Sequence, residues 1–98
     1  MKSAAFQHLL NHYRSNKQYL ITEIQTLIDN DNLIDNTNLM KIAKYFGALD
    51  CLYWQALGMG ELNLAKGIRR TIDKSKNPLA MSECGVKFLN KLRHTLRA

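Results

Sequence analysis

Residues 51–72 read CLYWQALGMGELNLAKGIRRTI. An aromatic-rich helical pattern runs up to Gly58, and a second helical pattern begins directly after Gly60. A connection this short forces the second helix to fold back against the first. The segment is therefore predicted to form an antiparallel helical hairpin.

The hairpin extends outward on both sides of this turn. Apolar residues at helical spacing predict one helix over about 39–57 and a second over about 62–74. Pro78 is expected to end the second helix, because proline lacks a backbone N–H and disfavours helical angles in the residue before it. The predicted hairpin then spans about Leu39 to Lys74.

The remaining sequence supplies further helices. Helical spacing continues from about Ser3 to Ile28, and Ser15 followed by Gln18 is a capping-box pattern that would divide this segment in two. Both a single helix and a break at Ser15 remain open. A last amphipathic helix is expected over about 82–96. The predicted fold is a single all-α domain over residues 1–98, with four or five antiparallel helices in a bundle or a short repeat-like array.

Cysteine usage and hydropathy indicate the compartment. Cys51 and Cys84 lie singly inside predicted helices, so they are interpreted as core residues rather than as a disulfide or a nucleophile. No apolar run approaches the ~20 residues that cross a bilayer, and the N-terminal segment lacks the apolar core of a signal peptide. A soluble cytoplasmic protein without a membrane partner is expected.

Positive charge is concentrated in the last third of the chain. The formal net charge is +6, yet residues 1–64 carry five basic and six acidic side chains. Residues 65–98 carry nine basic and two acidic side chains, a balance of +7. An acidic partner, whether protein or nucleic acid, is expected to bind there.

No motif in the chain predicts catalysis. His8 and His12 have the spacing of a helical metal chelate, but two ligands do not complete a site, so surface packing is the preferred interpretation. The acidic stretch from Asp29 lacks the glycine of a calcium loop and has Met40 where that loop needs glutamate. We expect neither an enzyme nor a bound metal or cofactor.

One pattern resembles a helix-turn-helix DNA-binding motif. Residues 39–57 read LMKIAKYFGALDCLYWQAL, with small residues and Gly47 spaced as in that motif. The recognition helix would be about Asp50 to Leu57, where Gln55 is the one typical base reader. The resemblance implies a small nucleic-acid-binding regulator, which is kept as an alternative function.

The hairpin also resembles a tetratricopeptide repeat, in which small residues allow two helices to cross closely. Tyr53 and Arg69 depart from that pattern, standing where a small residue and an aromatic are usual. One repeat cannot bury its own core. The resemblance is carried by Leu52, Gly60, Leu62, Ala65, Ile72 and the pair Asn77-Pro78.

About half of the chain, from Ala48 onward, resembles the small needle-subunit chaperones of bacterial type III secretion systems. The resemblance is carried by Cys51, Tyr53, Leu57-Gly58, Gly60, LAKGIRRTI, Asn77-Pro78 and FLNKLRHTL. It implies an apolar groove that holds a helical secreted subunit. The groove residues would be Tyr53, Trp54, Leu57, Leu62 and Ile68.

These observations favour a non-catalytic adaptor or chaperone that binds an amphipathic helix of another protein. Tyr53 and Trp54 are adjacent, about 100° apart on a helix, so one of them is expected to stay exposed. A structural homodimer that buries this aromatic face is a further alternative. The rim of the groove is expected to pair with acidic side chains through Lys66, Arg69, Arg70, Lys87 and Lys91.

Overall fold

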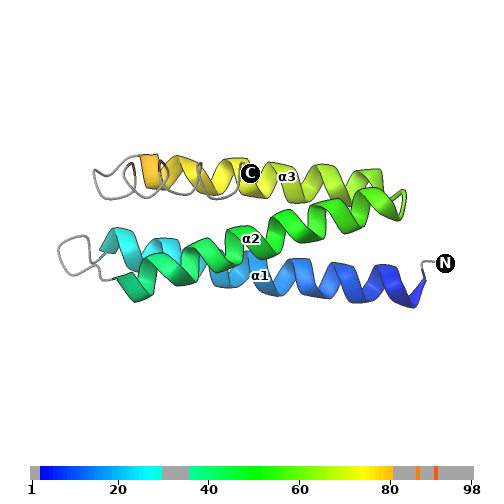
Figure 1. Ribbon diagram of the computed structural model, residues 1–98, viewed down its shortest axis with the longest axis horizontal. Helices are drawn as coiled ribbons and strands as arrows, with labels where there is room; N and C mark the ends of the chain where they lie inside the picture. Colours follow the sequence, from blue (N-terminus) through cyan, green and yellow to red (C-terminus); the bar gives the residue numbers. More distant parts are fainter. Residues whose placement is uncertain (1–2, 30–35, 81–85, 87–89, 91–98) are drawn as a thin grey trace.

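The computed structural model describes residues 3–29, 36–80, 86 and 90. Within them the chain forms three helices, α1 (Ala4–Asp29), α2 (Asn36–Gly58) and α3 (Leu62–Ala80). Figure 1 shows the helices side by side, with α2 running back along α1 and α3 running back along α2. The described part contains no strand. The all-α class is therefore confirmed for the described residues.

The described residues hold fewer helices than the four or five expected. The helix predicted over about 82–96 lies outside them, except for Val86 and Asn90. Two predicted rim residues, Lys87 and Lys91, also lie outside the described residues.

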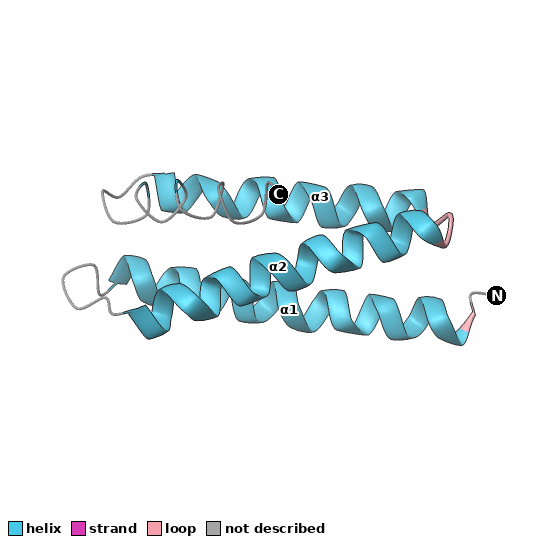
Figure 2. Cartoon of the chain, in the orientation of Figure 1, coloured by secondary structure: helices cyan, strands magenta, loops and turns pink. Residues whose placement is uncertain are grey.

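The turn between α2 and α3 closes with a Schellman motif. The Glu61 N–H donates to the Ala56 carbonyl at 2.9 Å, and the Gly60 N–H donates to the Leu57 carbonyl at 3.0 Å. Gly60 has φ of 75°, the left-handed conformation that this motif requires and that glycine adopts without strain. Figure 2 shows the resulting short loop between the two helices. The predicted antiparallel hairpin is confirmed.

α1 is one continuous helix, so the possible break at Ser15 is not present. The capping box does not form, because Gln18 Nε2 donates forward to Thr22 Oγ1 at 3.5 Å instead of turning back to Ser15. The cap lies at the start of the helix, where Ser3 Oγ accepts from the Phe6 N–H at 3.1 Å.

The core is a seam along which the three helices meet. Buried apolar residues recur three or four positions apart along α2, from Leu20 to Leu27 in α1 and from Ala65 to Ile72 in α3, the spacing that lets antiparallel helices interlock. In the middle of α1, between Leu9 and Leu20, the half-buried Tyr13 packs against this seam. The buried residues are Leu9, Leu20, Ile24, Leu27, Ile42, Phe46, Leu49, Leu52, Ala56, Ala65, Ile68, Ile72 and Leu79.

The prediction that α3 ends near Lys74 is wrong, because the helix continues through Pro78 to Ala80. A proline inside a helix costs about 3 kcal/mol through its missing donor and its clash with the preceding turn. Burying a leucine side chain returns about 1.5–3 kcal/mol. Leu79 is fully buried and continues the α3 seam beyond Ile72, which keeps this segment helical on the bundle.

Cys51 is exposed on α2, so its assignment to the core is wrong. The buried positions of this stretch are Leu49, Leu52 and Ala56. Successive helical residues are rotated by about 100°, which turns Cys51 away from the seam that Leu52 enters.

The turn makes a testable prediction about two glycines. Gly60→Ala should destabilise the protein by about 1 kcal/mol, because alanine is strained at positive φ. Gly47→Ala should stabilise it by roughly 0.5–1 kcal/mol, because Gly47 lies inside α2 and an added Cβ meets no atom within 4 Å beyond the local backbone of α2. Urea unfolding measures the free energy of unfolding of both variants. Equal changes of the same sign would contradict the assignment of a left-handed conformation to Gly60 and a helical one to Gly47.

Candidate protein-binding groove

A surface hollow of about 500 Å³ lies between α2 and α3, close to the hairpin turn. We call it the α2/α3 groove. It combines apolar side chains with the charged side chains of α3. Its lining residues are Tyr53, Leu57, Leu62, Ala65, Lys66, Arg69, Arg70, Asp73 and Lys74.

One wall of the α2/α3 groove is an aromatic and guanidinium pair. The Arg69 guanidinium lies over the Tyr53 ring, with its carbon 4.5 Å from the ring centroid. A guanidinium over an aromatic face is attracted by the ring quadrupole, and its planar shape stacks well there. Both side chains are half-buried, so the pair ties α2 to α3 while one side of it faces the hollow.

Trp54 stands beside this wall without lining the groove. Its ring contacts the Tyr53 ring edge to face, with the centroids 5.3 Å apart. Trp54 is 60% exposed, whereas Tyr53 is half-buried. The prediction that one of these two aromatics stays exposed is confirmed. A large exposed aromatic is typical of protein contact surfaces.

Leu62 and Ile68 occupy very different places. Leu62 begins α3 at the groove and is 58% exposed, so its side chain is available to a partner. Ala65 is buried in the floor, and Leu57 packs half-buried against the core. Ile68 is fully buried in the seam and does not line the groove. A partner would therefore meet Leu62 but not Ile68.

The charge along the groove is strongly positive. Four lining residues are basic, namely Lys66, Arg69, Arg70 and Lys74, and Asp73 is the acidic residue among them. α3 as a whole carries five basic residues against this one aspartate. The predicted rim residues Lys66, Arg69 and Arg70 thus border one groove with Tyr53, Leu57 and Leu62.

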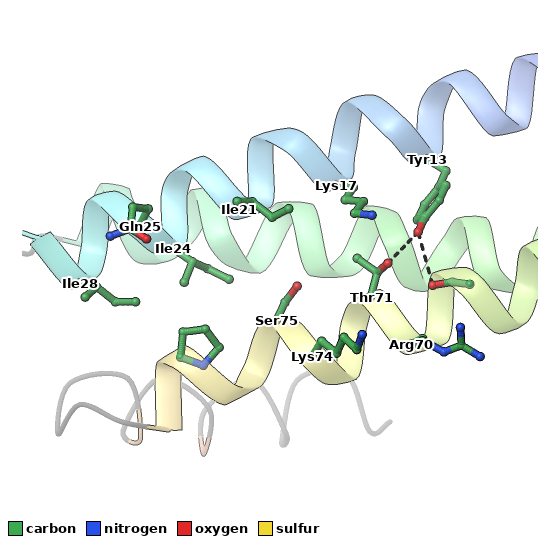
Figure 3. Close-up of a pocket in the computed structure, with 12 residues that line it drawn as sticks. Tyr13, Lys17, Ile21, Ile24, Gln25, Ile28, Arg70, Thr71, Lys74 and Ser75 are labelled. Carbon is green, nitrogen blue, oxygen red and sulfur yellow. Dashed lines mark hydrogen bonds between the residues drawn. The ribbon is translucent and has the colours of Figure 1, made fainter.

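A second hollow, of about 430 Å³, lies between α1 and α3 and was not expected from the sequence. Ile21, Ile24 and Ile28 line it from α1, and Thr71, Ser75 and Pro78 line it from α3 (Figure 3). Arg70 and Lys74 border both hollows. The spacing of the isoleucines in α1 could have indicated one wall of this hollow from the sequence. The wall on α3 could not be predicted, because it depends on the helix continuing through Pro78.

Tyr13 bridges α1 and α3 at one end of this second hollow. Its hydroxyl lies 2.6 Å from Thr71 Oγ1 and donates to the Gly67 carbonyl at 3.4 Å. Figure 3 shows the Tyr13 side chain pointing across the gap to α3. The two hydrogen bonds satisfy a half-buried phenol and hold the middle of α1 against α3.

The helix-turn-helix resemblance fails in its geometry. α2 is a single helix from Asn36 to Gly58 and passes through Gly47 without a turn. Residues 50–57 are therefore the second half of α2, not a separate recognition helix. Tyr53 and Leu57 within that stretch pack against the core, which leaves little of it to enter a DNA groove.

Two further features concern metals and membranes. His8 and His12 are exposed on α1, and no cluster of three or more His, Cys, Asp or Glu occurs within the described residues. None of the three helices combines the length and apolar character needed to cross a bilayer, as far as the described residues extend.

The described residues thus define an antiparallel helical protein with an aromatic and basic surface groove. Comparison of the chain with protein-family models, curated proteins and solved structures finds no match. The groove itself is therefore the feature from which a function can be inferred.

The Tyr13 bridge predicts a measurable coupling between α1 and α3. Tyr13→Phe should lower the free energy of unfolding by about 1 kcal/mol, because it removes a half-buried hydroxyl from two partners. Tyr19→Phe is the matched control, since Tyr19 is 55% exposed. In a double-mutant cycle with Thr71→Val, the two losses should not add. Additive losses would show that the 2.6 Å contact does not contribute.

Proposed function

We propose that this protein binds an acidic amphipathic helix of another protein in the α2/α3 groove. The role is that of a non-catalytic adaptor or chaperone, as in the secretion chaperones that the C-terminal half resembles. Leu57, Leu62 and the Tyr53 ring receive the apolar side chains of the partner. Trp54 extends this contact beyond the groove.

The observation that carries the proposal is that the groove combines an apolar floor with a predominantly positive rim. Lys66, Arg69, Arg70 and Lys74 surround an opening whose acidic member is Asp73. An amphipathic helix with glutamates beside its apolar stripe matches both properties at once. Exposed Leu62 and Trp54 supply apolar area that a monomer leaves in water.

The same basic helix supports a second candidate, a regulator that binds nucleic acid. α3 carries five basic residues against one acidic residue. Phosphate contacts would make such binding fall steeply with salt, whereas burial of apolar side chains depends much less on salt. The protein partner is favoured because the basic residues surround an apolar hollow.

A designed peptide tests the proposal directly. The probe is a helical peptide of about 20 residues with Leu and Ile at i, i+3, i+4 and i+7 and Glu on both flanks. A control peptide has the same composition with the apolar residues scattered around the helix. Fluorescence anisotropy should show binding of the first peptide and at least about tenfold weaker binding of the second.

Two matched pairs of variants locate the binding. Leu62→Glu should weaken the peptide by about tenfold or more, because it replaces an apolar contact with a repelling charge. Met40→Glu, on a residue 71% exposed and outside the groove, should leave it unchanged. Lys66→Glu should weaken binding more than Lys41→Glu, since Lys41 does not line the groove.

Three outcomes would contradict the proposal. Equal effects of Leu62→Glu and Met40→Glu would place the peptide elsewhere. Displacement of the peptide by generic duplex DNA, with steep salt dependence, would favour the nucleic-acid regulator. Sedimentation showing a dimer that dissociates on Trp54→Ala would favour self-association through the aromatic face.

A further inference from the structure

The imidazoles of His8 and His12 face each other on the exposed side of α1. The two Nε2 atoms are 3.2 Å apart, and the ring centroids are 4.7 Å apart with the planes at 76°. The residues are one helical turn apart, so the backbone of α1 fixes their separation. Without a metal, one ring donates its Nε2 proton to the other, and the tautomers decide which.

This separation matches the bite of a metal chelate. Late first-row divalent ions bind imidazole nitrogen at about 2.0–2.1 Å. Two such bonds meeting at 90–109° place their nitrogens roughly 2.9–3.4 Å apart. The 3.2 Å between the Nε2 atoms lies inside that range. An ion can therefore replace this hydrogen bond once the two rings turn their Nε2 lone pairs toward it, and the course of α1 need not change.

The surroundings select the kind of ion. His8 and His12 line a hollow of about 340 Å³ whose other wall includes Gln55 on α2 and Met59 in the turn that follows α2. These side chains are neutral donors, and no third His, Cys, Asp or Glu joins the pair within the described residues. Hard ions such as Mg²⁺ and Ca²⁺ require several charged oxygens, which this hollow lacks. Imidazole nitrogens favour late transition ions, with Cu²⁺ bound most strongly.

We propose that His8 and His12 form a two-imidazole site for a late first-row divalent ion, with Cu²⁺ preferred and water completing the coordination. The ion joins two successive turns near the start of α1. The site lies on the α1 face that Gln55 and Met59 approach, so it is separate from the α2/α3 groove. It stands or falls independently of the proposed function.

The test is a titration of the full chain with Cu²⁺, monitored by calorimetry and electron paramagnetic resonance. The titration uses the chain without a polyhistidine tag. Cys51→Ser and Cys84→Ser together remove the thiols that would compete for copper. One ion should bind per chain, with hyperfine coupling to two nitrogens. His8→Ala or His12→Ala should each weaken binding roughly a hundredfold, because the chelate loses its second arm.

Two controls keep the outcome decisive. His94→Ala removes one histidine from the chain and should leave affinity unchanged. His12→Ala combined with Arg14→His keeps three histidines but moves one imidazole to another face of α1, so it should bind as weakly as His12→Ala alone. Circular dichroism checks that each variant remains helical. Unchanged affinity in His8→Ala or His12→Ala, or restored affinity in the relocated variant, would overturn the proposal.

Discussion

The left-handed backbone at Gly60 is the constraint on which the rest of the arrangement depends. It lets α2 end in a Schellman motif and lets α3 begin at Leu62, two residues after Gly60, in the opposite direction. Because the connection is so short, the register of α3 on α2 is fixed near the turn. Ala65 and Ile68 then enter the seam, and Lys66 and Arg69 fall at its edge.

The groove follows from this register. Small Ala65 in the floor leaves room between α2 and α3, and the Arg69 guanidinium over Tyr53 forms the wall instead of closing the gap. An apolar pair of helices with large residues at these positions would fill the space. The two departures from the tetratricopeptide pattern, Tyr53 and Arg69, are therefore the residues that contact each other across the hairpin.

Much of this architecture could be predicted from the sequence, because helical periodicity and the two turn glycines are local properties. The groove residues Tyr53, Leu57, Leu62, Lys66, Arg69 and Arg70 were predicted and line one hollow. The features that were not predicted depend on how the helices pack against one another. Leu79 keeps α3 helical through Pro78, Cys51 faces outward, and the Tyr13 contact with Thr71 joins residues 58 positions apart, which no local pattern reports.

The central claim is that the α2/α3 groove, and not the second hollow between α1 and α3, receives a helical partner. Backbone amide chemical shifts of the ¹⁵N-labelled protein, followed during titration with an acidic amphipathic peptide at physiological salt, test it most directly. If the partner binds in the α2/α3 groove, the largest changes occur at Tyr53, Leu57, Leu62 and Lys66. Changes concentrated at Ile21, Ile28 and Thr71 would contradict it.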